Sequence, residues 1–333
     1  MSLRAFTVSA REAGQSLVAW LASKLARPEH EVRHWLRQRK VRVAGQLCSN
    51  AGWRVRAGQR VEVEVPFPTE HPGTLCPSSS RRNSRTAEIT IRFIDEHLVV
   101  VEKPPGLTTM RHAEDVAAFG PRAKKYLPPT LLDLLPGVVQ AHTGKPAGRL
   151  RAVHRLDKET SGLIVFARSA AAESSLGVQF RAHSIERVYH ALVRGVAVSA
   201  RIESTLVPDR GDGRRGSGPP GSRDGQHAVT HVRLLEALGA FSLVECRLET
   251  GRTHQVRIHL GEAGTPLCGE RIYDRPLHGK PLPDGSGVSR VALHAATLGL
   301  DHPLTGKRLF WTSPLPPDLE ETLKRLRRLA RPT

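Results

Sequence analysis

Near the start of the chain, hydrophobic residues recur at helical spacing in two stretches. In the first stretch they are Leu17, Trp20, Leu21 and Leu25. In the second stretch, which we expect Pro28 to open because proline is favoured in the first helical turn, they are Val32, Trp35 and Leu36. Residues three and four apart lie on the same face of a helix, so both stretches are predicted to form helices with one buried side.

The pattern then changes from helical spacing to alternation. Val61, Val63 and Val65 alternate with charged residues in R-V-E-V-E-V, as expected for a strand with one buried face. A shorter segment before it, V-R-V-A-G, predicts a strand that ends in a turn. Residues 1–66 are therefore expected to form a small domain of helices and strands.

Two later segments lack any hydrophobic period. Residues 67–87 are rich in proline, serine and arginine, which is the composition of a linker. Residues 208–227 contain a similar mixture with more glycine, and we expect a mobile basic loop there. The remaining chain, 88–333, is predicted to form the larger domain.

The larger domain is predicted to contain both strands and helices. Short apolar or alternating runs typical of strands cover 89–94, 97–102, 162–167, 188–194 and 242–248. A last helix is expected to begin at Pro317, with an apolar stripe formed by Leu319, Leu323 and Leu326. This mixture favours an α+β fold, with a mixed or largely antiparallel central sheet and flanking helices.

The charge of the chain narrows the class of partner. Lys and Arg number 50 against 32 Asp and Glu, which gives a formal net charge of +18. Such an excess repels itself unless a polyanion neutralises it, so it favours a nucleic-acid partner; the plainer alternative is the arginine-rich codon usage of a GC-rich genome. No apolar run is long enough to span a membrane and the N-terminus lacks a secretory signal, so we expect a cytoplasmic protein.

Cysteine and histidine spacing gives no sign of a metal site. No C-x-x-C pair occurs among the four cysteines, which are Cys48, Cys76, Cys246 and Cys268. This spacing argues against a zinc module and against a disulfide scaffold. The histidines at 254, 259 and 294 also lack a recognised ligand spacing, so we expect reduced thiols and no bound metal.

One stretch carries a candidate catalytic residue. Residues 154–162 read H-R-L-D-K-E-T-S-G and run directly into an apolar strand. Asp157 lies between Arg155 and Lys158, and nearby positive charge favours an ionised carboxylate that can act as a nucleophile or a base. On its own, such a cluster more often caps a surface turn.

The wider sequence resembles the RluA/RluD-type pseudouridine synthases, which isomerise uridine in RNA. H-R-L-D-K-E-T-S-G is similar to their catalytic signature, and four further segments resemble their other motifs in the same order. These segments are L-V-V-V-E-K-P-P-G-L at 98–107, R-V-Y-H-A-L-V-R-G at 187–195, L-E-T-G-R-T-H-Q-V-R-I-H-L at 248–260 and L-H-A-A-T-L-G-L-D-H-P-L-T-G at 293–306. The resemblance implies the pseudouridine synthase fold for the larger domain.

The resemblance also implies roles for single residues. Asp157 would be the catalytic carboxylate, Tyr189 the ring that stacks on uracil, and Arg252 the basic residue that pairs with Asp157. Arg155 would fill the space that the extracted uridine leaves in the RNA stack. Further RNA-contacting or loop-fixing residues would be Lys103, His254 and Arg257. From its strand alone Tyr189 is as readily a core tyrosine, and the Lys-Pro turn at Lys103 is equally consistent with a packing role.

The N-terminal domain resembles the S-four RNA-binding domain. The resemblance rests on V-R-V-A-G-Q and V-R-A-G-Q-R-V-E-V, which are similar to its two strand-and-turn segments. The second predicted helix also carries basic residues opposite its apolar side, namely Arg33, Arg37, Arg39 and Lys40. A charged helix face is usually only solvated, but together with the strand match it favours contact with RNA.

These features predict an RNA pseudouridine synthase, an isomerase acting on uridines in structured ribosomal or transfer RNA. The ribose leaves uracil nitrogen 1 and rejoins the base at carbon 5 within one pocket, so no cofactor is expected. We expect the protein to act as a monomer. The alternative is a non-catalytic RNA-binding or ribosome-associated protein on the same fold, and the presence of Asp157, Tyr189 and Arg252 argues against it.

Overall fold

We describe the protein from a computed structural model, in which the chain divides into two compact units, Met1–Cys76 and Pro77–Thr333. The structure describes residues 2–9, 12–25, 32, 35–36, 40–48, 50, 53–65, 89–111, 116, 120, 127–276 and 279–330. The linker predicted at 67–87 lies outside the described residues, and so do Arg33, Arg37 and Arg39.

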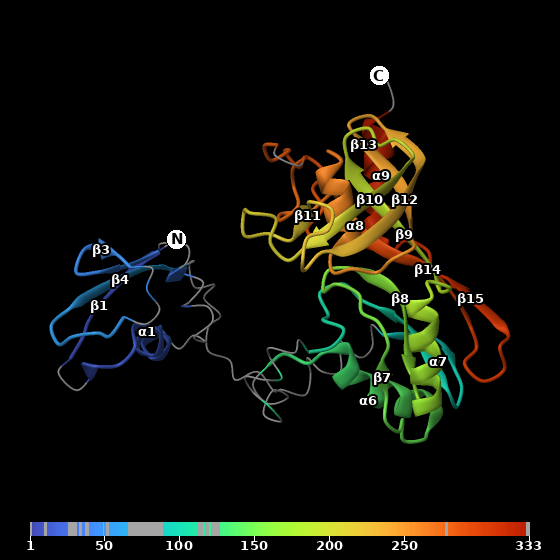
Figure 1. The fold of residues 1–333 in the computed structure, drawn as a ribbon, viewed down its shortest axis with the longest axis horizontal. Coiled ribbons are helices and arrows are strands. Elements are labelled where there is room, and N and C mark those ends of the chain that lie inside the picture. Colours follow the sequence, from blue (N-terminus) through green and yellow to red (C-terminus); the bar gives the residue numbers. More distant parts are fainter. Residues whose placement is uncertain are drawn as a thin grey trace. The chain divides into compact units, whose positions relative to one another are not determined.

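The first unit contains a small antiparallel sheet with a helix packed on it (Figure 1). Its described strands, in the sheet order β1-β4-β2-β3, are β1 (Ser2–Thr7), β4 (Arg60–Val65), β2 (Val41–Val43) and β3 (Gln46–Leu47). Helix α1 (Leu17–Leu25) buries Leu17 and Leu21 in the same core as Val61 and Val63. The predicted apolar helix face and the alternating strand are therefore confirmed.

The second predicted helix is described only in part. Val32, Trp35 and Leu36 are helical and lie in the core of the first unit. Lys40 follows them, and its backbone carbonyl accepts a hydrogen bond from the Glu64 amide at 2.9 Å. This bond joins Lys40 to β4.

The second unit is built on one mixed sheet. Its described strands are β5 (Thr90–Ile94), β6 (Leu98–Lys103), β7 (Arg151–Ala152), β8 (Ser161–Ala167), β9 (Glu186–Arg194), β10 (Ala200–Val207), β11 (Gly216–Gly218), β12 (Gln226–Leu238), β13 (Phe241–Leu248), β14 (Leu293–Asp301) and β15 (Arg308–Thr312). Their order is β11-β10-β12-β13-β9-β14-β8-β6-β5, with β7 beside β8 and β15 beside β14. Every one of these pairs is antiparallel except β8 with β14, so the predicted mixed, largely antiparallel sheet is confirmed.

Helices flank this sheet, as Figure 1 shows. They are α6 (Leu131–Thr143), α7 (Ala170–Arg181), α8 (Gln255–Glu262) and α9 (Pro317–Leu329). The side chains of β8 are buried on both faces: Ile164 and Phe166 pack in a core with α6, whereas Leu163 and Val165 pack in a core with α7. The predicted leucine stripe of α9 is buried against β12 and β13.

Residues 208–227, predicted from their composition to be a loop throughout, contain a short strand and are tied to the rest of the unit. The segment contains β11, which pairs with β10, and the carboxylate of Glu262 holds it against α8. Arg210 Nη1 donates to Glu262 Oε1 at 2.8 Å, and Ser217 Oγ donates to Glu262 Oε2 at 2.6 Å. These partners are distant in sequence, so the composition of the segment could not show them.

Gly162, the last residue of H-R-L-D-K-E-T-S-G, lies where β8 meets β14. Its φ is +112°, and it pairs with Ala295 in the parallel contact between these strands. A Cβ atom at this position would lie 2.7 Å from the Ala295 backbone nitrogen and closer still to the Ala295 carbonyl oxygen. Glycine is therefore required for the contact that positions β8 beside the centre of the sheet.

We predict that Gly162→Ala lowers the free energy of unfolding by roughly 2–4 kcal/mol, because the new methyl group meets backbone atoms and the positive φ disfavours a side chain. Urea denaturation measures this change. Gly137→Ala in α6 is the matched control, since a Cβ atom there meets nothing within 4 Å. Alanine favours a helix over glycine, so the control should be neutral or more stable, and equal stability of both variants would contradict the prediction.

Candidate active site

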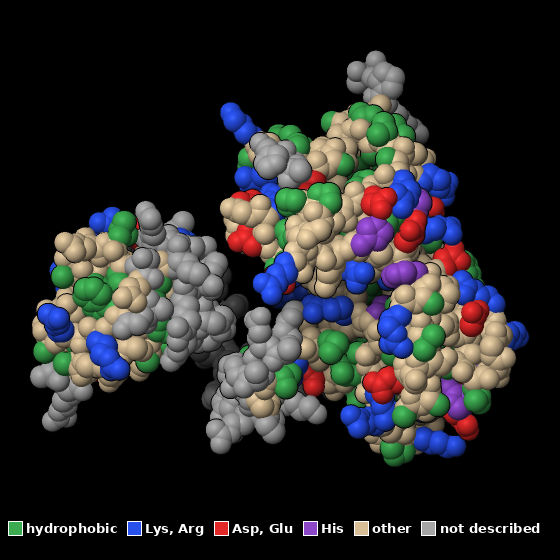
Figure 2. All heavy atoms as spheres, in the orientation of Figure 1, with side chains coloured by type: hydrophobic (Ala, Val, Ile, Leu, Met, Phe, Trp, Pro, Cys, Tyr) green, Lys and Arg blue, Asp and Glu red, His purple; other side chains and the backbone are tan. Residues whose placement is uncertain are grey.

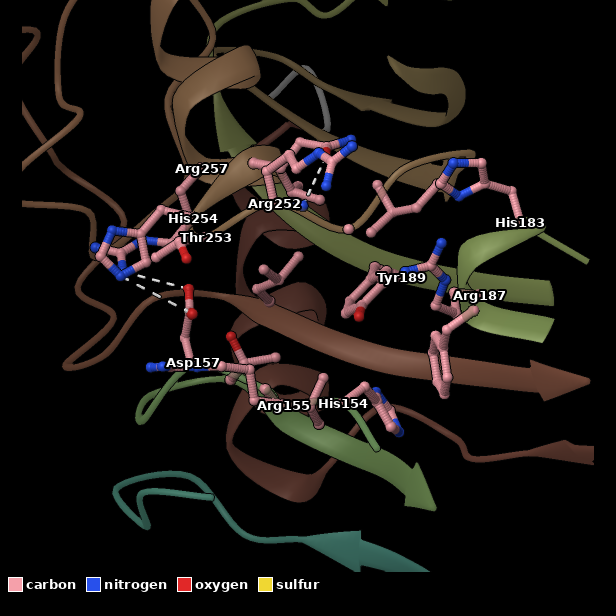
Figure 3. Close-up of a pocket in the computed structure, with 18 of the residues that line it drawn as sticks. His154, Arg155, Asp157, His183, Arg187, Tyr189, Arg252, Thr253, His254 and Arg257 are labelled. Atoms are coloured by element: carbon pink, nitrogen blue, oxygen red, sulfur yellow. Dashed lines mark hydrogen bonds and ion pairs between the residues drawn. The ribbon is translucent and has the colours of Figure 1, made fainter. Parts of the chain in front are cut away.

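A cleft of about 400 Å³ opens beside the loop that precedes β8 (Figure 3). The described residues that line it come from the loop 153–160, the end of α7 and the turn after it, the start of β9, the end of β13, the loop 251–254, the first turn of α8 and the start of β14. Most of the residues predicted from the sequence line this cleft, namely Arg155, Asp157, Tyr189, Arg252, His254 and Arg257. The fold thus brings together motifs that are about 100 residues apart in sequence.

Asp157 faces two basic side chains from the start of α8 (Figure 3). Its Oδ2 lies 3.4 Å from Arg257 Nη1, and its Oδ1 lies 3.9 Å from His254 Nε2. His254 has a left-handed backbone with φ of 60°, and its Nδ1 lies 2.8 Å from the Tyr273 hydroxyl. Burial lowers the pKa of His254, so the permanent positive charge beside Asp157 belongs to Arg257.

A buried carboxylate holds Arg257 in place. The Glu270 side chain is 0% exposed, and its oxygens accept from Arg257 Nε at 2.7 Å and Arg257 Nη2 at 2.9 Å. Burial opposes ionisation of Glu270, but the Arg257 bonds and the backbone N–H of Ile272 outweigh it and keep the pKa of Glu270 below its usual value. Such a bidentate ion pair fixes the plane of the guanidinium, and the remaining nitrogen, Nη1, is directed at Asp157.

The pairing that the sequence interpretation gave to Arg252 is made by Arg257. Arg252 Nε instead donates to the backbone carbonyl of His227 at 2.9 Å. The reason is the start of α8: His254 is its N-cap residue, and Arg257, in the first turn, is turned inward to Asp157 and Glu270. Arg252 lines the cleft from the preceding loop.

Tyr189 lies in β9, where Cys246 of β13 and Ala295 of β14 are its register partners. The residue is 8% exposed and lines the cleft, and it shares a core cluster with Ala191 and Val193. Burial raises the pKa of the Tyr189 phenol to about 12. The ring is therefore an uncharged surface at neutral pH.

Two contacts fix the backbone on either side of Asp157. Thr109 Oγ1 donates to the Leu156 carbonyl at 2.8 Å and accepts from the Leu156 amide at 3.1 Å. Lys103 Nζ donates to the Lys158 carbonyl at 3.0 Å. The residue before Asp157 is thus held by Thr109 in the segment after β6, and the residue after it by Lys103 at the end of β6.

Lys103 does not face the cleft, so the expectation that it contacts RNA is wrong and the packing alternative holds. It is 1% exposed, and its ammonium also donates to the carbonyls of Pro104 at 2.9 Å and Leu107 at 2.8 Å. Burial lowers the pKa of Lys103 to about 7. The Lys-Pro motif therefore serves to close its own turn and to hold the Asp157 loop.

His154, the first residue of the signature, is also structural. Its Nε2 accepts a hydrogen bond from the Val165 amide at 3.1 Å, and its ring lies 4.7 Å from the Phe180 ring, centroid to centroid. Burial lowers the pKa of His154 to about 3, so the ring is neutral. This bond ties the loop before Asp157 to the middle of β8.

The sequence interpretation missed two residues of the site. Glu270 lies in the segment G-E-R-I-Y at 269–273, and nothing in that segment distinguishes a buried acid from a surface acid. Arg187 lies two positions before Tyr189, and residues two apart in a strand share a face. That spacing was a usable signal, because it places Arg187 beside Tyr189 in the cleft.

Basic side chains gather along the middle of the second unit in the face shown in Figure 2.

In the part of the chain that the structure describes, no group of three or more His, Cys, Asp or Glu side chains could hold a metal ion. None of the described helices is long and apolar enough to cross a membrane.

Comparison with known families matches both units. The pattern of the family described as "RNA pseudouridylate synthase" matches residues 97–262, and that of the "S4 domain" matches residues 15–61. Among solved structures, human RNA Pseudouridylate Synthase Domain Containing 4 is similar with a TM-score of 0.58 and 26% identity, covering 74% of this chain and 95% of that one.

Curated relatives are similar over most of their length. Ribosomal large subunit pseudouridine synthase D of Zymomonas mobilis is 34% identical over 289 residues, covering 85% of this chain and 84% of that protein. An uncharacterized RNA pseudouridine synthase of Bacillus subtilis is 34% identical over 305 residues, covering 90% of this chain and 89% of that protein.

We predict that Thr109→Val lowers the free energy of unfolding by about 1–3 kcal/mol, because it leaves both buried backbone groups of Leu156 without their partner. Urea denaturation measures the change, and the half-buried neighbour Thr108→Val is the matched control. If the two valine variants were equally stable, the Thr109 hydroxyl would not be holding the loop.

Proposed function

The chain belongs to the RNA pseudouridylate synthase family, and from this premise we propose that Asp157 is the carboxylate with which it converts uridine to pseudouridine. The enzyme is an isomerase. The bond from ribose carbon 1′ to uracil nitrogen 1 breaks, a bond to carbon 5 forms, carbon 5 loses a proton and nitrogen 1 gains one. Atoms and charge balance without an added group donor.

The observation that carries this proposal is the contact between Asp157 and the fixed guanidinium of Arg257 in the cleft. A positive charge 3.4 Å away stabilises the negative charge of the carboxylate and holds its orientation. Both candidate first steps, attack on the ribose and removal of a ribose proton, begin from that carboxylate. The uncharged Tyr189 ring offers the flat surface on which a uracil can stack.

We further propose large-subunit ribosomal RNA, modified in the cytoplasm, as the substrate. The curated relatives named ribosomal large subunit pseudouridine synthase D support this choice. The target base must leave its stack to reach Asp157, and exposed Arg155 at the cleft is suited to fill the gap. The S4-like unit and the net charge of +18 support additional contacts to RNA phosphates.

We predict that Asp157→Asn reduces turnover by roughly 10³-fold or more, because the amide can serve neither as a nucleophile nor as a base. Release of tritium from carbon 5 of labelled uridine in large-subunit ribosomal RNA measures turnover. Equal release by wild type and variant would remove Asp157 from the mechanism. Absence of release by the wild type from any cellular RNA would favour the binding-only alternative.

We predict that two matched arginine-to-lysine changes separate orientation of Asp157 from binding of RNA. Arg257→Lys should lower kcat by roughly 100-fold, because lysine cannot reproduce the planar fork that Glu270 holds against Asp157. Arg252→Lys should leave kcat within about 3-fold, since its side chain does not contact Asp157.

Steady-state kinetics on the same RNA measure both variants, with thermal unfolding as the control for folding. A larger loss of kcat in Arg252→Lys than in Arg257→Lys would restore the role first assigned to Arg252. Equal losses would show that neither contact is specific to catalysis.

A further inference from the structure

The end of the cleft opposite Asp157 is basic and has no assigned role. Figure 3 shows Arg187 and His183 at this end, Asp157 and His254 at the other, and Tyr189 between them. Arg181, at the end of α7 and two residues before His183, also lines the cleft and, like His183, is exposed. A uracil held between Asp157 and Tyr189 would leave this second end for another part of the RNA.

Arg187 is a buried charge that no carboxylate neutralises among the described residues. It is 8% exposed, and Nη2 donates to the backbone carbonyl of Glu249 at 3.0 Å. Its Nε is buried without any hydrogen-bond partner in the described structure. Burial lowers the pKa of Arg187; the Tyr189 phenol offsets part of this effect, and the nearby charge of Arg252 adds to it. A buried guanidinium in this state is costly until an anion reaches it.

Arg194, on the same strand, shows that the fold can satisfy a buried arginine. It is 5% exposed, and its guanidinium donates to three backbone carbonyls, those of Leu267 at 3.0 Å, Glu270 at 2.7 Å and Leu282 at 2.6 Å. The Asp284 carboxylate lies 3.9 Å from its Nε. Arg187 has neither this number of acceptors nor such a carboxylate, so its guanidinium is less completely paired than that of Arg194.

We propose that Arg187 binds a backbone phosphate of the RNA next to the target uridine, with Arg181 and His183 at the rim of the same subsite. The proposal rests on the proposed function, since it assumes that the uridine occupies the Asp157 end. A guanidinium matches the oxygens of a phosphate, and negative charge is what this end lacks. A stacked base is a poorer fit, because the Phe180 ring is already in contact with two side chains. The Arg187 Cζ lies 5.6 Å from the centroid of the Phe180 ring, and the His154 ring also packs against Phe180.

The first test compares Arg187→Met with Arg194→Met, two buried arginines of β9. Binding to oligouridylate is measured over a range of salt concentrations. Arg187→Met should raise Kd by roughly 10-fold and reduce the slope of log Kd against log salt by about 0.7, the change for one lost phosphate contact with a single strand. Arg194→Met should leave the slope unchanged.

Thermal unfolding of the same variants without RNA distinguishes binding from a structural role. Removal of an uncompensated buried charge should leave Arg187→Met at least as stable as the wild type. Arg194→Met should unfold at a lower temperature, because three carbonyls lose their donor. The proposal would be overturned if Arg187→Met left the slope of log Kd against log salt unchanged and lowered the unfolding temperature as Arg194→Met does. Arg187 would then be a structural residue.

The second test changes the RNA. Each phosphate near a uridine that the wild type modifies is replaced in turn by an uncharged methylphosphonate. At one position the replacement should weaken binding of the RNA by the wild type roughly 10-fold. At the same position it should not weaken binding by Arg187→Gln any further, because this variant has already lost the contact. If the replacement weakens binding of wild type and variant equally at every position, the subsite does not exist. Tritium release by the wild type tests the proposed function independently of this result.

Discussion

The buried ion pair between Glu270 and Arg257 fixes the positive charge on which the arrangement of the cleft depends. Glu270 cannot exchange its partner for water, because its side chain is fully enclosed. Its second set of contacts, from the backbone N–H of Arg271 and Ile272, ties the carboxylate to its own loop. Arg194 of β9 holds the carbonyl of the same residue. A strand, a loop and a helix therefore meet at Glu270, and these contacts hold Arg257 in its direction toward Asp157.

The carboxylate itself is held by separate restraints. Thr109 and Lys103 fix the backbone before and after Asp157, and His154 ties the same loop to β8. Gly162 then allows β8 to approach β14 closely enough for the parallel pairing. Four residues of the signature, His154, Leu156, Lys158 and Gly162, thus help to place one side chain. Such preorganisation is effective because a catalytic group displaced by about 1 Å loses much of its rate advantage.

The sequence predicted the fold class and several strands from the hydrophobic period, and the order of the motifs singled out Asp157 and Tyr189, which both line the cleft. It could not choose between Arg252 and Arg257. Both lie in R-T-H-Q-V-R, and only the start of α8 after left-handed His254 decides which side chain turns inward. The expectation that Lys103 contacts RNA failed for a related reason. Its three carbonyl partners come from the folded turn and from the Asp157 loop, and the sequence does not show these contacts. The hairpin at β11 likewise depends on Glu262, about 45 residues away.

The depth of Tyr189 has a consequence for the outcome of the reaction. Tyr189 is 8% exposed, the side chain of Asp157 is 19% exposed, and apolar Leu248, Val256 and Leu293 line the same cleft. An enzyme that detaches a base and returns it to the same sugar competes with hydrolysis, which would leave an abasic site in the RNA. Few water molecules can reach a ribose bound beside these side chains. We therefore expect the burial of Tyr189 and its apolar neighbours to protect the RNA chain during the interval when base and sugar are apart.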